Sequence, residues 1–363
     1  MKKYITLDNL KQKNLSDILL YIMNNGETTR RKIQADTGFS WGTVSNSVTY
    51  LIEKGYVQEG VCNDETKGAG RKTSVLFPRG DKIVGLGIDV NRAGIDTVII
   101  GFDGNIIYKQ IFSFDANSQK ELINLIENVI DELISICKDK YLVKSIGLSF
   151  QGEIDGEKGI SYAFPAINDW QPFNVKEYFF NKYQIPIYFE HDPKCMLYSL
   201  KNTCKADDAL LIRADEGIGL AVMQEGKIMD DKKRLELGHM LFLSDGQVDK
   251  TKNLEYFASA KSIVNATKKS INDIKKDEQN YLSEIENATK YLSLAVYNLY
   301  VLFRPEKIYL TGFLFSIESY EKSFKKQLKK LLDEEVQIVT DLNLCAAYGV
   351  AIHSLKYNIK VNV

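Results

Sequence analysis

The chain has 363 residues, of which 44% are hydrophobic and 26% are charged, and its formal net charge at pH 7 is −1. A chain of this length can bury a sizeable core, and two or three globular units are expected. Its apolar runs are shorter than a membrane span, and no signal-peptide core follows the N-terminal lysines, so a cytoplasmic protein is predicted. The five cysteines lack paired close spacing, which favours reduced, packed thiols over a disulfide framework.

Residues 28–52 have the pattern of a helix-turn-helix. Two short helices are expected, with Gly38 permitting the turn between them. Thr28 or Thr29 would cap the first helix and Ser40 the second. The side chains expected to face the core are Ile33, Ala35, Val44, Val48, Leu51 and Ile52.

The remaining face of the second helix predicts a contact with DNA. Small polar side chains near a helix start can enter the major groove, whereas a plain helical hairpin is the alternative. The side chains predicted to reach DNA from this motif are Arg30, Trp41, Thr43, Ser45, Asn46 and Thr49.

Two extended runs, 56–61 and 73–77, predict a winged form of the motif. The glycines before Arg71 and Lys72 let the backbone approach a surface, and narrow minor grooves attract arginine, so both basic residues are predicted to contact DNA. A flexible basic hairpin tip is the alternative. Residues 1–80 hold 12 Lys and Arg against 8 Asp and Glu, whereas the rest holds 35 against 40. The positive charge therefore lies on the predicted DNA-binding domain.

After a boundary expected near residue 80, the pattern changes to a repeat of strands and helices. The first copy is a three-strand meander, a helix and a strand: 83–90, 97–102, 105–114, 118–137 and 143–150. The second copy has expected strands at 209–213, 219–224 and 227–229. Helices are expected from Leu254 onward. The repeat predicts two α/β lobes, roughly 81–190 and 191–363, with a cleft between them.

Short segments in order along nearly the whole chain resemble one known family. They are Gly70-Arg71, Gly87-Ile88-Asp89-Val90, Glu190-His191-Asp192, Gly217-Ile218-Gly219, Glu236-Leu237-Gly238-His239-Met240 and Leu254-Glu255. The pattern resembles the ROK family (repressors, open reading frames and kinases). The resemblance implies an N-terminal winged helix-turn-helix over 1–80 and an actin-like, ribonuclease-H-like two-lobed α/β module over 81–363. Similar members are either sugar kinases or sugar-responsive repressors.

Three departures from the family's kinases favour the repressor. Those kinases hold ATP phosphates on Gly-Gly-Thr-Lys and Gly-Thr-Gly turns, where this chain has Asn91-Arg92-Ala93-Gly94 and Asp215-Glu216-Gly217. The second change would set two carboxylates against a triphosphate, and like charges repel. The kinases' adenosine loop is a glycine triplet, whereas Phe313 here takes room that the nucleotide needs. No nucleotide cofactor is therefore predicted.

The sugar contacts of the family are better preserved. The resemblance implies that a sugar is bound by Asn168, His191, Asp192, Glu236, His239 and Glu255, with His191 where an asparagine is usual. Carboxylates and imidazole suit vicinal hydroxyls because they donate or accept with good directionality. In a kinase, Asp192 would be the general base. The alternatives are that Asp192 only caps the helix beginning at Pro193, and that His239 is an ordinary buried histidine.

A zinc site is not predicted. The family commonly places a Cys-x-Cys-x-x-x-x-Cys run after the Gly-His motif, whereas residues 240–260 contain neither cysteine nor histidine. A tetrahedral site needs four ligands, and three are absent.

The combined prediction is a transcriptional repressor whose C-terminal module is a catalytically inactive sugar sensor. Its expected partners are double-stranded operator DNA, a sugar effector such as a pentose (xylose) or a hexose, and a second copy of the chain, because one winged helix reads one half-site. The alternatives are an active ATP-dependent sugar kinase with an auxiliary DNA-binding domain, and a module that serves only for dimerisation.

Overall fold

A computed structural model of the chain describes residues 7–61, 74–92, 94–114, 116–203, 206–229, 235–244, 246–332, 336–339 and 346–362. The fold contains two compact units, residues 1–202 with 345–363, and residues 203–344. The second unit is shorter at both ends than the predicted second lobe, 191–363. Helices α6 (Asp192–Thr203) and α12 (Ala346–Asn362) belong to the first unit, because both pack there against the first sheet or each other.

The N-terminal part of the first unit is the predicted winged helix-turn-helix. Its elements are α1 (Leu7–Asn25), α2 (Arg30–Thr37), α3 (Trp41–Glu53), β1 (Val57–Val61) and β2 (Ser74–Pro78), the strands being antiparallel. The predicted caps are confirmed: Lys32 N–H donates to Thr29 Oγ1 at 3.1 Å, and Thr43 N–H donates to Ser40 Oγ at 3.2 Å. Gly38 makes the turn with φ of +71°.

The predicted core of this motif is correct except at one position. Ile33, Val44, Val48 and Leu51 are fully buried. Ala35 is exposed, so its predicted inward position is wrong. Residues two apart lie on opposite sides of a helix, and Ile33 already occupies the inner side.

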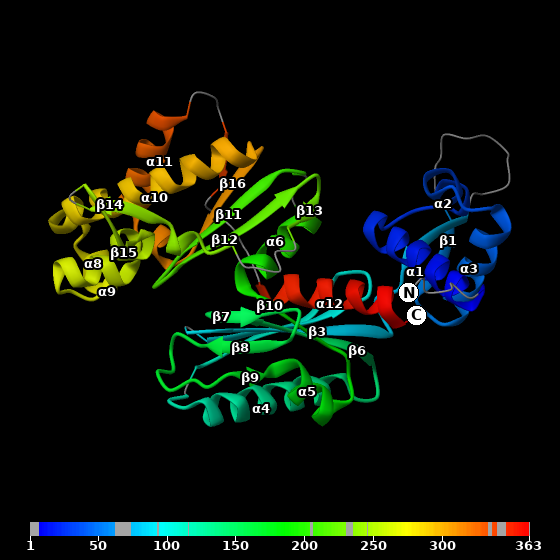
Figure 1. The fold of residues 1–363 in the computed structure, drawn as a ribbon. Helices are drawn as coiled ribbons and strands as arrows, with labels where there is room; N and C mark the ends of the chain where they lie inside the picture. Colours follow the sequence, from blue (N-terminus) through cyan, green and yellow to red (C-terminus); the bar gives the residue numbers. More distant parts are fainter. Residues whose placement is uncertain are drawn as a thin grey trace, which may run out of the picture. The chain divides into compact units, whose positions relative to one another are not determined.

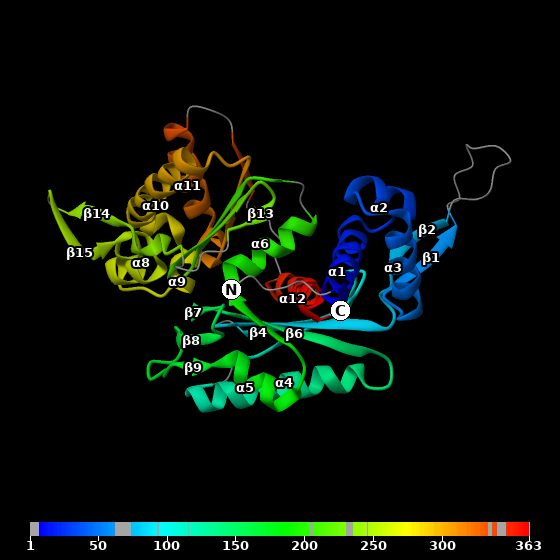
Figure 2. The same ribbon diagram turned by 45° about the vertical axis from the view of Figure 1, so that its right-hand side comes forward.

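The first unit is built on a mixed five-stranded sheet in the order β10-β6-β3-β4-β5. Its strands are β3 (Ile83–Asn91), β4 (Gly94–Gly101), β5 (Ile106–Phe112), β6 (Leu142–Phe150) and β10 (Ile187–His191). Figure 1 labels β3, β6 and β10 of this sheet. Helices α4 (Gln119–Cys137) and α5 (Val175–Tyr183) cover one face and α12 covers the other (Figure 2). Strand β3 is buried along its whole length, as a strand covered on both faces should be.

The second unit repeats this topology. Its sheet has the order β13-β12-β11-β16-β17, with β11 (Ala209–Ala214) antiparallel to β12 (Ile218–Gln224) and parallel to β16 (Lys307–Thr311). Strand β13 (Lys227–Ile228) closes the meander and β17 (Gln337–Val339) continues the parallel side. The predicted internal repeat is confirmed, because β3, β4 and β5 are related in the same way to β6 and β10.

The second unit's core lies between its sheet and its helices, above all α10 (Leu282–Phe303) and α11 (Glu318–Leu331). The remaining short elements of the two units are β7 (Glu153–Asp155), β8 (Ile160–Ala163), β9 (Phe173–Asn174), η1 (Leu237–His239), β14 (Leu241–Ser244), β15 (Gln247–Asn253), α7 (Leu254–Ala258), α8 (Ala260–Thr267), α9 (Ile271–Lys276), η2 (Glu278–Tyr281) and η3 (Phe313–Ser316). None of the helices in the described part of the chain combines the length and apolarity that crossing a membrane requires.

Helix α12 lies directly on the first sheet because β3 and β6 present glycines to it. A Cβ atom at Gly87 would lie 2.0 Å from the Ala347 carbonyl oxygen, and one at Gly147 would lie 2.5 Å from that of Val350. The helix also approaches α6 closely, since a Cβ at Gly349 would lie 1.7 Å from the Cys195 carbonyl oxygen. Only glycine at these positions permits such close backbone packing.

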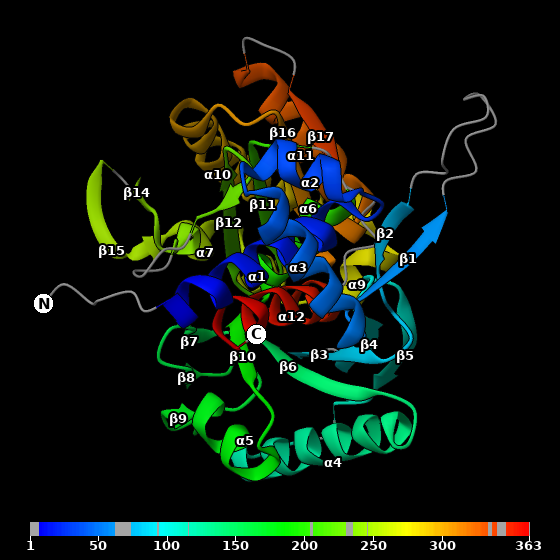
Figure 3. The same cartoon turned by 90° about the vertical axis from the view of Figure 1, so that its right-hand side faces the viewer.

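The same helix joins the winged helix-turn-helix to the sheet. Ser16 of α1 donates its hydroxyl hydrogen bond to the Ile359 carbonyl of α12 at 2.9 Å. One hydrophobic cluster contains side chains of α1, α3, β2, β4 and α12: Ile18, Leu19, Ile22, Val48, Leu51, Leu76, Val98, Ile100, Ala351, Ile352 and Leu355. Figure 3 shows α1 beside α12. The expected boundary near residue 80 is therefore crossed by a continuous core.

Replacing Gly349 by alanine should destabilise the first unit by about 1–3 kcal/mol, the usual cost of overpacking. The new methyl group would overlap the Cys195 carbonyl. Urea denaturation measures the change. Gly42→Ala is the matched control, because it is also a helical glycine and its nearest neighbour is Ser40 Oγ at 4.0 Å. The control should be as stable as the parent or more so, and equal stability of parent and Gly349→Ala would contradict this packing.

Candidate functional site

The outer face of α3 carries most of the side chains predicted to contact DNA. Trp41 is 48% exposed and directly follows the helix cap. Asn46 and Thr49 are exposed, and Ser45 is half-buried. Spacings of four and eight residues from Trp41 place Ser45 and Thr49 on one side of the helix. Thr43 is half-buried, and its hydroxyl lies 2.9 Å from that of Ser40, so it also belongs to the cap.

Arg30 is engaged within the motif. Its Nη1 donates to Glu59 Oε1 of β1 at 2.6 Å, and the Ser74 hydroxyl of β2 donates to the same carboxylate. The Arg30 hydrogen bond is the largest cause that lowers the pKa of Glu59. Arg30 therefore ties α2 to both strands of the wing, a contact that the sequence pattern does not reveal. Arg71 and Lys72 lie outside the described residues.

A row of polar side chains marks the carboxyl ends of three neighbouring parallel strands in the first unit. Asp89 of β3 is in register with Ser149 of β6, and Ser149 is in register with Glu190 of β10. All three residues are buried. Ligands of α/β sheets bind at the carboxyl ends of strands where the strand order reverses direction, and β3 has this position here. The sequence motifs include Asp89 and Glu190 but predict no contact for either residue.

The Asp89 carboxylate is held by its neighbours. Ser149 donates its hydroxyl hydrogen bond to Asp89 Oδ1 at 2.5 Å, and Asn91 Nδ2 donates to Asp89 Oδ2 at 3.0 Å. The buried Cys195 thiol lies near this group, and burial first, then the Glu190 carboxylate, raises its pKa well above the ordinary value. Cys195 is therefore a packed thiol and not a nucleophile.

His191 and Asp192 follow this row at the junction of β10 and α6. Asp192 is only 3% exposed, and His191 Nε2 lies 3.4 Å from its Oδ1. The His191 backbone N–H donates to Glu190 Oε1 at 2.9 Å. The buried carboxylate can accept a hydrogen bond from one sugar hydroxyl, and the neighbouring imidazole can donate one to the next. Asn168 is exposed in the loop between β8 and β9.

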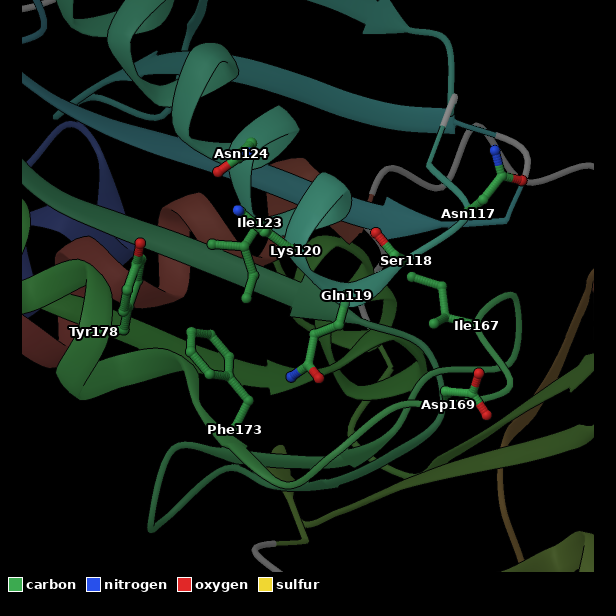
Figure 4. A pocket seen from close by; sticks show the side chains of 10 residues that line it. All are labelled: Asn117, Ser118, Gln119, Lys120, Ile123, Asn124, Ile167, Asp169, Phe173 and Tyr178. Carbon is green, nitrogen blue, oxygen red and sulfur yellow. The ribbon is translucent and has the colours of Figure 1, made fainter.

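The loop that contains Asn168 borders a hollow of about 580 Å³ at the start of α4. The Gln119 side chain fixes this loop by two hydrogen bonds to the Gln171 backbone: its Nε2 donates to the carbonyl, and its Oε1 accepts from the N–H. Figure 4 shows Ile123, Phe173 and Tyr178 on one side of the hollow and Ser118 and Asp169 on the other. Neither His191 nor Asp192 lines it, so this hollow differs from the predicted sugar site.

The second unit gathers Glu236, His239 and Glu255 around η1. The carboxylate of Glu255 accepts a hydrogen bond from the Ile218 N–H at 2.9 Å. It fits between two glycine turns, because a Cβ at Gly238 would lie 2.4 Å, and one at Gly217 2.8 Å, from Glu255 Oε1. Glu236 and His239 flank Gly238 and are exposed, which excludes the buried-histidine alternative for His239.

Asp215 occupies the turn that resembles a phosphate turn of the kinases. Its Oδ2 accepts a hydrogen bond from Arg213 Nε at 2.5 Å, and its Oδ1 accepts one from the Phe313 backbone N–H at 2.6 Å. The Phe313 side chain is 38% exposed. The Asp215 carboxylate thus joins the turn after β11 to the Phe313 backbone, and the prediction that Phe313 takes room that a nucleotide needs stays a prediction.

The two repeated sheets define an actin-like, ribonuclease-H-like module, here combined with a winged helix-turn-helix. The model of the ROK family matches residues 85–352, and the chain belongs to this family. The xylose repressor of Bacillus subtilis (strain 168) is 24% identical over 331 residues, which cover 86% of this chain and 84% of the relative.

Solved structures show the same fold. A crystal structure of a ROK family transcriptional regulator, a homolog of the E. coli MLC protein, covers 97% of both chains with a TM-score of 0.79 and 18% identity. A ROK family glucokinase from Streptomyces griseus, in complex with glucose and AMPPNP, matches with a TM-score of 0.59 and 15% identity. It covers 75% of this chain and 98% of its own. The regulator thus matches a larger part of this chain than the kinase does.

Arg30→Ala and Glu59→Ala should weaken binding to an AT-rich operator duplex to a similar extent, because each breaks the same contact between α2 and the wing. The free energy of unfolding should fall by less than about 1 kcal/mol in both, as for a partly exposed ion pair. Fluorescence anisotropy at several salt concentrations measures the binding. A loss confined to Arg30→Ala, with the salt slope reduced by about one, would instead assign Arg30 to a DNA phosphate.

Proposed function

We propose that the chain is a sugar-responsive transcriptional repressor in which residues 1–80 bind operator DNA and residues 81–363 form a sensor without kinase activity. The observation that carries this proposal is the hydrophobic core shared by the winged helix-turn-helix and the first sheet through α12. Packing of this kind would couple the DNA-binding motif to a displacement of α12. The relative in Bacillus subtilis named a xylose repressor makes xylose the first effector to test.

DNA binding is supported by the outer face of α3. Its core side is fixed by Val44, Val48 and Leu51, so the opposite side with Trp41 and Asn46 is free to enter a major groove. Base contacts from this helix would specify the sequence, and basic side chains near the wing would position the protein on the phosphates. Because one motif reads one half-site, a homodimer is the proposed functional form.

Sugar sensing is proposed for the two groups described above, Asn168, His191 and Asp192 in the first unit, and Glu236, His239 and Glu255 in the second. Carboxylate, imidazole and amide groups can accept hydrogen bonds from vicinal sugar hydroxyls or donate to them. The proposal requires polar residues of both units for sugar binding. A variant in either unit can therefore test it.

Communication between sugar and DNA is proposed to run through α6 and α12. Asp192 begins α6, and α6 touches α12 where Gly349 faces the Cys195 carbonyl. A ring stack adds to this contact, since Tyr198 of α6 and His353 of α12 have centroids 3.7 Å apart at 16°. The far end of α12 then holds α1 through Ser16. A sugar changes operator affinity only if it binds two arrangements of these helices unequally.

Absence of kinase activity is supported by the turn after β11. The Asp215 carboxylate there is held by Arg213 and by the Phe313 backbone N–H. Phosphoryl transfer depends on groups that position and neutralise the triphosphate. Carboxylates already engaged within the protein do not supply them.

Saturating xylose, or another aldose that binds, should stabilise the protein by about 2.7 kcal/mol at one hundred times its dissociation constant and should release operator DNA. Glu236→Ala should lose both responses and keep its affinity for operator without sugar. Differential scanning fluorimetry and a gel shift measure the two effects. Glu286→Ala removes another exposed carboxylate of the second unit and serves as control. A sugar response in Glu236→Ala equal to that of the parent would contradict the proposed site.

The purified protein with Mg-ATP should not phosphorylate aldoses above background, because the Asp215 carboxylate already engages the donors of the turn after β11. A coupled assay for ADP measures turnover over a panel of pentoses and hexoses. Robust turnover that disappears in Asp192→Asn would show an active kinase with an auxiliary DNA-binding domain.

A further inference from the structure

The second unit contains a site whose geometry fits a small oxyanion. Arg213 is the second-last residue of β11 and Phe313 is the second residue after β16, and these neighbouring strands are parallel, with Arg213 in register with Thr311. Strand β11 is flanked by antiparallel β12 on one side and parallel β16 on the other. The carboxyl ends of strands at such a reversal are the usual anion-binding position of an α/β sheet.

The donors at this position suit an oxyanion. A guanidinium N–H and a backbone N–H approach from different strands, and their acceptors are the two oxygens of one carboxylate, at 2.5 and 2.6 Å. Charge-assisted hydrogen bonds of this length are strong. The side chains of Arg213 and Asp215 are only 13% and 15% exposed, so water screens the interaction weakly.

The turns around the carboxylate are tightly packed. A Cβ at Gly312 would lie 2.3 Å from the Ala214 carbonyl oxygen and 2.7 Å from Asp215 Oδ1. The backbone is also fixed, since the Asp215 N–H donates to the Gly217 carbonyl and the Ala260 N–H donates to that of Asp215, both at 2.9 Å. The carboxylate therefore joins the turn after β11 to the turn after β16.

We propose that Arg213 and the Phe313 N–H form an oxyanion site that the chain fills with its own Asp215 carboxylate. Asp215 takes the place of an external anion, such as a phosphoryl group, and holds the two turns together without one. The second unit then keeps its arrangement whether or not nucleotides or phosphate are present. This proposal stands apart from DNA binding and sugar sensing, and its test requires neither.

The test is chemical rescue of the full-length chain. Asp215→Ala should melt at a lower temperature than the parent, and sodium formate should raise its melting midpoint by about 2–4 °C over sodium chloride of equal ionic strength. Formate carries the carboxylate that the substitution removes. Inorganic phosphate is the second probe and tests whether the space accepts a larger oxyanion. The parent should respond to neither, because its site is filled.

Two further variants make the outcome specific. Asp215→Asn keeps the volume and leaves no space, so formate should have no effect on it. Asp215→Ala combined with Arg213→Gln removes the principal donor and should also lose the rescue. If Asp215→Ala is unfolded at the start of the scan, recovery of the near-ultraviolet circular dichroism signal on adding formate replaces the melting shift. An Asp215→Ala protein as stable as the parent, a formate effect equal in parent and variant, or a rescue that persists without Arg213 would overturn the proposal.

Discussion

The close packing of α12 on the glycine-bearing face of β3 and β6 is the constraint on which the rest of the first unit depends. Glycines at 87 and 147 bring the helix backbone against the sheet, and Gly349 brings α6 against the helix. Side-chain layers would separate these elements, whereas here backbones meet. Packed interiors do not deform continuously, so a displacement of α6 would be expected to reach α12 and, through it, α1. This arrangement joins the winged helix-turn-helix to the core of the first unit.

The sequence predicts those features that local chemistry determines. Thr29, Ser40 and Gly38 have cap or turn roles that residue type and position already indicate, and the meander recurs because its hydrophobic pattern recurs. The role of α12 is not predictable in this way. Its contact with α1 joins residues separated by 343 positions. The packing role of a glycine is known only when the backbone that contacts it is known. For the same reason, the sequence wrongly places α6 and α12 in the second lobe.

The candidate sites likewise combine residues that local sequence predicts with contacts that only the fold reveals. Motif resemblance indicates His191, Asp192, Glu236 and Glu255, because each stands in a short segment with a recognisable order. Motif resemblance does not reveal contacts between different elements, such as Ser149 with Asp89 or Arg30 with Glu59. Considered alone, the Asp215 carboxylate in the turn that resembles a phosphate turn predicts repulsion of a triphosphate. The fold instead supplies a guanidinium and a backbone N–H that satisfy it.

We propose that sugar and operator communicate through α12. Thermodynamic linkage requires that operator DNA lower the affinity for sugar by the same factor by which sugar lowers the affinity for operator. The most direct measurement is therefore the sugar dissociation constant with and without saturating operator duplex, by calorimetry, in the parent and in Ser16→Ala, which removes the hydrogen bond from α1 to α12. In the parent, we expect sugar and operator to lower each other's affinity by equal factors. In Ser16→Ala we expect a factor closer to one, with unchanged sugar affinity in the absence of DNA. The same factor in both proteins would contradict communication through α12.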